Sequence, residues 1–177
     1  MSRIGKKQIE IPAGVEVAID GSIVKVKGPK GEISREIDSR LVVSKEGSVL
    51  SVSLLKVGDE LSPLWGTYAS HIVNMIEGVT RGFEKKLEIQ GIGFKGEVKG
   101  NEIVFSLGFS HPLNVKIPAG LTVMIDKGII TVSGTNKDNV GAFTASIRDL
   151  KKPEPYKGKG IRYLGEHVIM KQGKKTV

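Results

Sequence analysis

The chain has 177 residues, of which 39% are apolar, 23 are glycine and none is cysteine. This composition allows one or two globular domains and excludes a disulfide framework, a cysteine nucleophile and a cysteine-ligated metal site. Lysine and arginine total 27 against 19 aspartates and glutamates, and the formal charge of +8 favours a polyanionic partner. We expect no membrane partner, because no apolar run reaches the ~18 residues that span a bilayer and the N-terminal residues lack the apolar core of a signal peptide.

The first predicted unit, residues 1–81, consists of strands followed by a helix. Period-two alternation of apolar residues predicts its strands over residues 15–19, 23–27, 33–37, 41–44 and 49–54. Asp20-Gly21 predicts a tight turn between the first two strands. Ser62 followed by Pro63 predicts the start of a helix, and apolar residues at helical spacing continue it to Ile76.

The second predicted unit, residues 82–152, repeats this order of elements. Its strands are predicted over residues 86–90, 94–98, 103–107 and 113–117, and a hairpin that turns at Lys127-Gly128 follows them. A helix is predicted next, with Asp138 as its N-cap and with an apolar stripe that ends at Leu150. Pro153 ends this helix.

An internal repeat relates the two units. Residues 11–28 and 117–134 are identical at 10 of 18 positions, beginning with Ile-Pro-Ala-Gly in both. Two copies are too few for a solenoid, so we predict a duplicated α+β domain in which an antiparallel β-sheet is packed on one face by a helix. The predicted domains are residues 1–81 and 82–152, followed by a basic C-terminal segment, residues 153–177.

The positive charge is concentrated at the two ends of the chain. Residues 1–7 contain three basic and no acidic groups, and residues 151–177 contain eight basic against two acidic groups, which leaves a net charge of −1 between them. The basic residues at the ends are Arg3, Lys6, Lys7, Lys151, Lys152, Lys157, Lys159, Arg162, Lys171, Lys174 and Lys175. Because aromatic and apolar residues alternate with the C-terminal ones, the pattern favours RNA contact over a purely solvated tail.

Residues 153–161, Pro-Glu-Pro-Tyr-Lys-Gly-Lys-Gly-Ile, carry the strongest binding signal. The two prolines favour an extended chain, and Gly158 and Gly160 would let the main chain approach phosphates while the neighbouring lysines neutralise them. Tyr156 either stacks on a base or packs the segment onto its own domain. A surface turn without a ligand is the alternative interpretation.

Three other patterns are better explained by ordinary structure than by a ligand. Residues 91–96 match G-x-G-x-x-G, but a strand pattern follows instead of the helix that a dinucleotide site requires. Residues 28–31, Gly-Pro-Lys-Gly, resemble the nucleotide-clamping loop of KH domains, yet they join two strands, which favours a tight turn. The histidines are scattered without metal-ligand spacing, and no nucleophile, base and oxyanion site come together. We therefore predict no metal, cofactor, small-molecule substrate or enzymatic activity.

Five stretches, in order along the chain and together with the duplication, resemble the bacterial large-subunit ribosomal protein L6 family. They are residues 2–5 (Ser-Arg-Ile-Gly), 28–31, 82–89 (Gly-Phe-Glu-Lys-Lys-Leu-Glu-Ile), 107–112 (Leu-Gly-Phe-Ser-His-Pro) and 153–161. The resemblance implies two similar α+β domains, no catalysis, and a place in the large subunit of the cytoplasmic ribosome. It also implies binding to 23S rRNA near the factor-binding region, beside the sarcin–ricin loop, the stalk base and neighbouring ribosomal proteins, in support of subunit assembly and translation.

The resemblance assigns the RNA contacts mainly to the C-terminal domain and segment. The residues that it implies are Tyr156, Lys157, Gly158, Lys159 and Gly160, with Ser110 and His111 at a loop tip. If residues 153–177 form a separate tail, their deletion should leave two folded domains and remove most affinity for rRNA. The alternatives to this interpretation are an enzyme and a free basic adaptor that binds mRNA or a protein.

Overall fold

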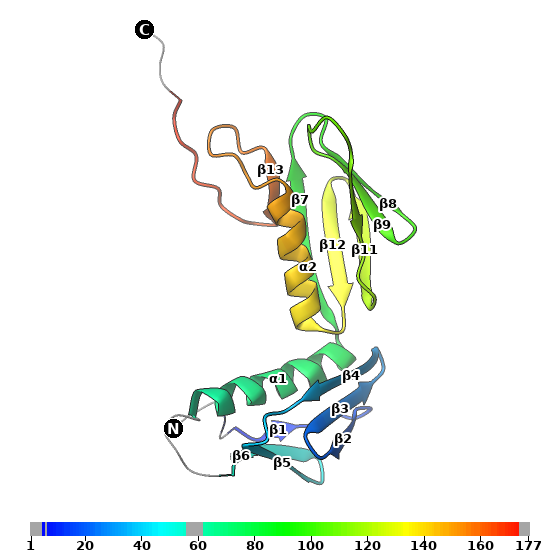
Figure 1. Ribbon diagram of the computed structural model, residues 1–177, viewed down its shortest axis with the longest axis vertical. Coiled ribbons are helices and arrows are strands. Elements are labelled where there is room, and N and C mark those ends of the chain that lie inside the picture. The colour runs from blue at the N-terminus through cyan, green and yellow to red at the C-terminus, as the bar shows by residue number, and fades with distance from the viewer. Residues whose placement is uncertain (1–4, 6, 56–61, 174–177) are drawn as a thin grey trace. The chain divides into compact units, whose positions relative to one another are not determined.

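The structure, a computed structural model, describes residues 5, 7–55 and 62–173. The chain divides into two compact units, one of residues 1–83 with 135–137 and one of residues 84–134 with 138–177 (Figure 1). Within its described residues, each unit combines antiparallel strand pairs with one helix, which confirms the predicted α+β class. The number of sheets differs from the prediction: each unit contains two sheets, whereas one was expected.

The first unit is built from two three-stranded sheets and α1 (Ser62–Thr80). One sheet has the order β2-β3-β4, formed by β2 (Glu16–Asp20), β3 (Ile23–Gly28) and β4 (Gly31–Glu36). The other has the order β1-β6-β5, formed by β1 (Ile9–Glu10), β5 (Leu41–Glu46) and β6 (Val49–Leu54). Their apolar faces and one face of α1 form a single core that includes Val26, Leu50, Ile72 and Val79. Val73, which the helical spacing also assigns to the buried face, is 43% exposed.

The second unit contains a three-stranded sheet, a four-stranded sheet and α2 (Lys137–Leu150). The smaller sheet, of order β10-β9-β8, consists of β8 (Lys95–Lys99), β9 (Glu102–Ser106) and β10 (Leu113–Lys116). The larger, of order β11-β12-β7-β13, consists of β7 (Phe83–Gln90), β11 (Leu121–Asp126), β12 (Ile129–Gly134) and β13 (Gly160–Tyr163). Figure 1 shows α2 lying along this larger sheet.

The backbone conformation at the turn between β11 and β12 agrees with the hairpin that the sequence pattern predicts. β11 and β12 pair from Leu121↔Gly134 to Asp126↔Ile129, so their loop is the two residues Lys127 and Gly128, as predicted. Both lie in the left-handed region, with φ of 47° and 80°, as a type I′ hairpin turn requires. The helix that follows begins at Lys137, one residue before the predicted cap, so Asp138 lies in its first turn. A carboxylate there still interacts favourably with the helix dipole.

The prediction that residues 153–177 form a separable tail is wrong for its central part. Gly160–Tyr163 form β13, which pairs antiparallel with β7 at the edge of the larger sheet. Ile161 is fully buried, so the second unit completes its core with a residue of this segment. Deleting the whole segment would therefore remove a strand from a folded unit.

The Gly-Pro-Lys-Gly motif is a tight turn between two strands, and its lysine also caps the C-terminal end of α1. Gly28 and Gly31 pair across the turn between β3 and β4. The main-chain N–H of Lys30 donates to the carbonyl of Val79 at 2.9 Å, and its ammonium group donates to the carbonyl of Arg81. Because the last turn of α1 contains no basic residue, Lys30 places a cation at the negative end of the helix dipole. The motif is thus explained without a nucleotide.

The G-x-G-x-x-G pattern also has a structural explanation. Residues 91–94 are the loop between β7 and β8, with no helix after them. Within the described residues, no three histidine, aspartate or glutamate side chains come together as a metal site. Among the same residues, no helix is long and apolar enough to cross a membrane.

Candidate nucleic-acid interface

The loop between α2 and β13, which carries the strongest sequence signal, is closed by main-chain hydrogen bonds. The N–H of Glu154 donates to the carbonyl of Lys159 at 2.8 Å, and the N–H of Gly158 donates to the carbonyl of Glu154 at 3.0 Å. The N–H of Ile161 donates to the carbonyl of Lys151 at 2.8 Å, which joins the end of the helix to the start of the strand. The loop therefore has a defined shape before any partner binds.

The two glycines of this loop are required by contacts inside the protein. A Cβ at Gly160 would lie 2.6 Å from the carbonyl oxygen of Lys152 and 2.8 Å from that of Lys151, and Gly160 has a φ of 145°. A Cβ at Gly158 would lie 3.2 Å from the Cε of Met170, and Gly158 has a φ of 67°, a left-handed conformation that favours glycine. Both glycines are buried, so packing and backbone conformation explain them without the close approach to phosphate that the sequence pattern suggests.

The side chains between and beside these glycines face solvent. Tyr156 is 56% exposed, and Lys157 is exposed while Lys159 is half-buried. Across the described residues, the side chains of Lys157, Lys159 and Lys171 make no hydrogen bond and no ion pair. These three ammonium groups therefore keep their charge available for a polyanion.

Two of the predicted basic residues are instead paired with acidic neighbours. Arg162 on β13 contacts Glu88 on β7, with Nη2 and Nε each 3.1 Å from Oε2. A hydrogen bond from Gln90, and then those from Arg162, lower the pKa of Glu88 below its usual value. Lys152 lies 3.3 Å from Asp149 on the exposed surface. Arg162 is therefore part of the sheet, and its charge is largely compensated.

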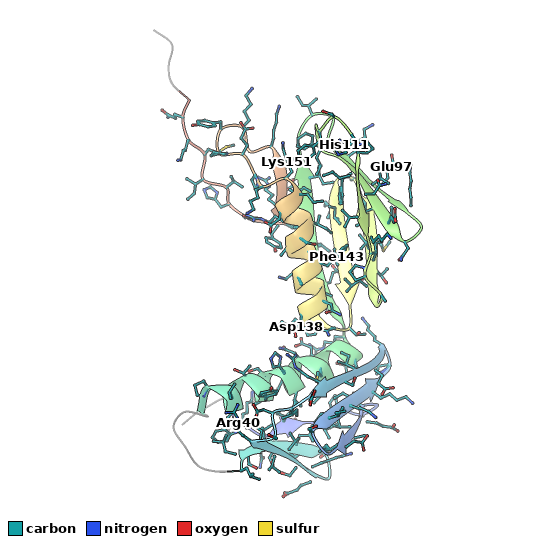
Figure 2. All side chains as sticks on the ribbon, in the orientation of Figure 1. Arg40, Glu97, His111, Asp138, Phe143 and Lys151 are labelled. Atoms are coloured by element: carbon teal, nitrogen blue, oxygen red, sulfur yellow. The ribbon has the colours of Figure 1, made fainter. Side chains whose placement is uncertain are left out.

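The loop of residues 107–112, between β9 and β10, lies at the same end of the second unit as Lys151. The Nζ of Lys151 lies 4.6 Å from the ring centroid of Phe109, which directly precedes Ser110 and His111. Figure 2 shows His111 and Lys151 at this end of the unit. Both Ser110 and His111 are exposed, and the structure thus brings them to the region of the 151–159 loop.

Phe94 connects this loop to the preceding one. A Cβ at Gly91 would lie 2.7 Å from the Phe94 ring, and a Cβ at Gly108 would lie 3.1 Å from it, so the ring rests on both glycines. The same two loops carry exposed apolar side chains, namely Ile92, which is 93% exposed, and Phe109, which is 45% exposed. We call residues 91–94, 107–112 and 151–159 the loop cluster. Sequence reasoning missed Phe109 and Phe94, although an aromatic residue after each of two loop glycines was a usable signal.

An ion-pair network fixes the chain after β13. Arg148 on α2 contacts Glu166 through two hydrogen bonds of 2.5 and 3.1 Å, and Glu166 also accepts the N–H of Tyr163 at 2.9 Å. These bonds lower the pKa of Glu166 and raise that of Arg148. Farther along, the N–H of Lys171 donates to the carbonyl of Pro155 at 2.8 Å. Residues 164–171 are thus held against the loop cluster, a role for Arg148 and Glu166 that the sequence did not indicate.

The predicted basic residues at the extreme ends are less informative. Arg3, Lys6, Lys174 and Lys175 lie outside the described residues, and Lys7 is exposed in the first unit beside a groove between β1 and α1.

The net charge differs between the two units. The second contains 15 basic and 9 acidic residues, whereas the first contains 12 and 10. The second unit is therefore the better candidate for binding a polyanion.

Comparison with known proteins gives matches over nearly the whole chain. A family model described as Ribosomal protein L6 matches residues 11–82 and 90–164, and its second segment includes β13. The chain is 49% identical to the large ribosomal subunit protein uL6 of Gemmatimonas aurantiaca, over 98% of both sequences. It is 47% identical to the protein of the same name from Alkaliphilus metalliredigens over 98% of both, and 44% identical to that from Methylobacterium nodulans over 99% of both.

Proposed function

The chain belongs to the ribosomal protein L6 family, and on that premise we propose that it is a structural component of the large ribosomal subunit that binds 23S rRNA. The single observation that carries the proposal is the similarity to uL6 proteins from end to end, at 44 to 49% identity. The family is structural and non-enzymatic, which agrees with the sequence prediction that no catalytic constellation is present.

We assign most of the RNA binding to the second unit. Its excess of basic residues and the unpaired ammonium groups of Lys157, Lys159 and Lys171 support this assignment. Each phosphate that a lysine neutralises releases condensed counterions, so such contacts supply affinity and position the protein without reading sequence. The full set of proposed contacts also includes Arg3, Lys6, Lys7, Ser110, His111, Lys151, Lys152, Tyr156, Arg162, Lys174 and Lys175. Arg162 is the weakest of these, since Glu88 already pairs with it.

The position on the subunit is the finer part of the proposal. Residues 153–161 and 107–112 carry the resemblance to the family, and residues 153–159 and 107–112 belong to the loop cluster. We therefore place the loop cluster against 23S rRNA near the sarcin–ricin loop and the stalk base, next to other large-subunit proteins. In this position a rigid protein would support subunit assembly and translation by holding RNA segments in place.

Sedimentation tests the proposal directly. The protein, expressed with a small tag in cells, should migrate with the large subunit through a sucrose gradient at high salt. A pool that stays at the top of the gradient, or that migrates with mRNA after ribosome dissociation, would favour the adaptor interpretation instead. Hydroxyl-radical footprinting of the purified protein on a 23S rRNA transcript containing the sarcin–ricin loop then tests the position.

Salt dependence tests the lysines. The double variant Lys157→Gln and Lys159→Gln should bind the transcript more weakly, and its slope of log K against log salt should be shallower by about 1.4 to 1.8, since each phosphate contact contributes about 0.7 to 0.9. The matched control, Lys25→Gln with Lys27→Gln, removes the same charge from β3 of the first unit. Equal slopes for the two double variants would refute direct phosphate contact by the loop.

A further inference from the structure

We propose that Phe109 and Lys151 form a stacking platform for one unpaired nucleotide of the RNA. This inference rests on the proposed RNA binding and adds to it the class of RNA feature that the loop cluster receives. It also names a residue, Phe109, that neither the sequence pattern nor the resemblance assigned to RNA contact.

The exposure of Phe109 is the first argument. An aromatic side chain that is 45% exposed on a loop loses the burial that normally stabilises it, whereas another phenylalanine of the same unit, Phe105, is fully buried in the core. No acidic residue occurs in residues 91–94 or 107–112, so the surroundings of the ring on its own loops carry no negative charge. An exposed ring in such a setting suits the face of a nucleobase.

The position of Lys151 is the second argument. Its ammonium group lies 4.6 Å from the Phe109 ring centroid and makes no other contact in the described part of the chain. An incoming base would take the place of the ammonium group on the ring, and the flexible lysine stem would let the charge move to the phosphate of the same nucleotide. Cation–π contacts at exposed sites are weak, so little free energy opposes the replacement of the ammonium group by a base.

The rigidity of the platform is the third argument. Phe94 packs on Gly91 and Gly108 and so fixes the backbone that carries Phe109. The backbone of Lys151 is fixed by the hydrogen bond from the N–H of Ile161. Because both partners stand on fixed backbone, a nucleotide can stack without ordering the loop first, which favours binding.

The chemistry points to an unpaired nucleotide rather than to a regular helix. A paired base in A-form RNA is stacked between its neighbours and offers no free face, whereas loops and bulges expose bases that aromatic side chains can stack on. Ile92, on the loop that Phe94 joins to that of Phe109, is 93% exposed, and an apolar side chain there favours a splayed base over a phosphate.

Binding titrations with a 23S rRNA transcript containing the sarcin–ricin loop test the platform through two different signatures. Phe109→Ala should weaken binding roughly 5- to 150-fold, the range for losing one base–aromatic stack, with no change in salt slope. Phe109→Tyr should bind within about twofold of the wild-type protein, because it keeps the ring. Lys151→Gln should make the salt slope shallower by about 0.7 to 0.9. Phe109→Leu, which keeps an apolar side chain without a π face, should behave like Phe109→Ala.

Several results would overturn the inference. Wild-type affinity for Phe109→Ala, or for Phe109→Leu, would show that no base stacks on the ring, while the proposed RNA binding would stand. An unchanged salt slope for Lys151→Gln would contradict a contact between Lys151 and a phosphate. If the wild-type protein itself does not bind the transcript, both the platform and the proposed function fail. A gain in fluorescence quenching on RNA addition for Phe109→Trp, relative to the wild-type protein with its single tryptophan at position 65, supports stacking directly.

Discussion

Truncating the chain at two different points separates the structural role of the C-terminal segment from the RNA binding that we propose for it. A stop after His167 keeps β13 and Glu166 and removes only residues 168–177. A stop after Lys152 removes β13 as well. We expect the longer chain to remain folded and the shorter chain to lose most of the stability of its second unit.

The magnitude follows from the contacts that each truncation removes. Ile161 is fully buried, and loss of such a side chain costs about 2 to 5 kcal/mol. The shorter chain also lacks Glu166, to which Arg148 donates two hydrogen bonds. Both side chains of this ion pair are about one-quarter exposed, so its loss costs a further ~1 kcal/mol. The total, about 3 to 6 kcal/mol, is a large part of the ~5 to 15 kcal/mol that a domain has. The longer chain loses the Lys171 to Pro155 hydrogen bond, which contributes about 1 kcal/mol.

Hydrogen exchange is the appropriate assay, because Trp65 lies in the first unit and does not report on the second. Exchange of the β7 amides, measured by mass spectrometry on peptides covering residues 84–90, should accelerate strongly in the shorter chain and little in the longer one. Amides of α1 serve as the internal control, since both truncations leave the first unit intact. Equal β7 protection in the two chains would refute the reasoning that β13 stabilises the sheet.

Three further predictions concern single side chains. Gly160→Ala should destabilise the second unit by about 2 to 3 kcal/mol because its Cβ would meet two carbonyl oxygens, and Gly173→Ala, which meets nothing within 4 Å, is the control in urea unfolding followed by circular dichroism. Lys30→Met should destabilise the first unit by about 1 kcal/mol through loss of the cation at the end of α1, and the change should appear in unfolding followed by Trp65 fluorescence. Because the pKa of Glu166 is lowered by Arg148, its carboxylate stabilises the fold above the usual carboxyl pKa and loses this contribution as pH falls through the lowered value. Glu166→Gln should therefore be less stable at pH 7 and lose less stability between pH 7 and pH 3; equal pH dependence of the two proteins in thermal unfolding would contradict the ion-pair assignment.

Local signals account for the elements that the sequence predicted well. The hairpins are encoded by alternation on both sides of a two-residue turn, and Lys127-Gly128 has the backbone conformation that such turns need. Both helices carry an apolar stripe that is long enough to predict a helix from the sequence, without knowledge of what the stripe packs against. The Gly-Pro-Lys-Gly turn was also predicted as a turn, although its contact with the end of α1 depends on the folded structure.

Non-local contacts account for what the sequence did not predict. β13 has only four residues, Gly-Ile-Arg-Tyr, and it lies in a segment rich in basic residues, so the sequence shows too short an alternation to predict a strand. Only its pairing with β7 makes it a strand. The loop cluster was likewise only partly predicted, because the contacts of Phe94 with Gly108 and of Lys151 with Phe109 join separate segments of the chain.

The pairing of β13 with β7 also constrains when the chain can fold during its own synthesis. Gly160 pairs with Gln90, 70 residues earlier, so the larger sheet stays incomplete until residues 160–163 have been translated. Most of the first unit comes from residues 1–83 and can fold while the second is still being made. Until β13 arrives, β7 presents an unpaired edge with Leu87 and Ile89 beside it, a site at which a nascent chain is prone to aggregate. The strand that directly follows the loop of residues 151–159, for which we propose RNA contacts, is thus also the one that closes this edge.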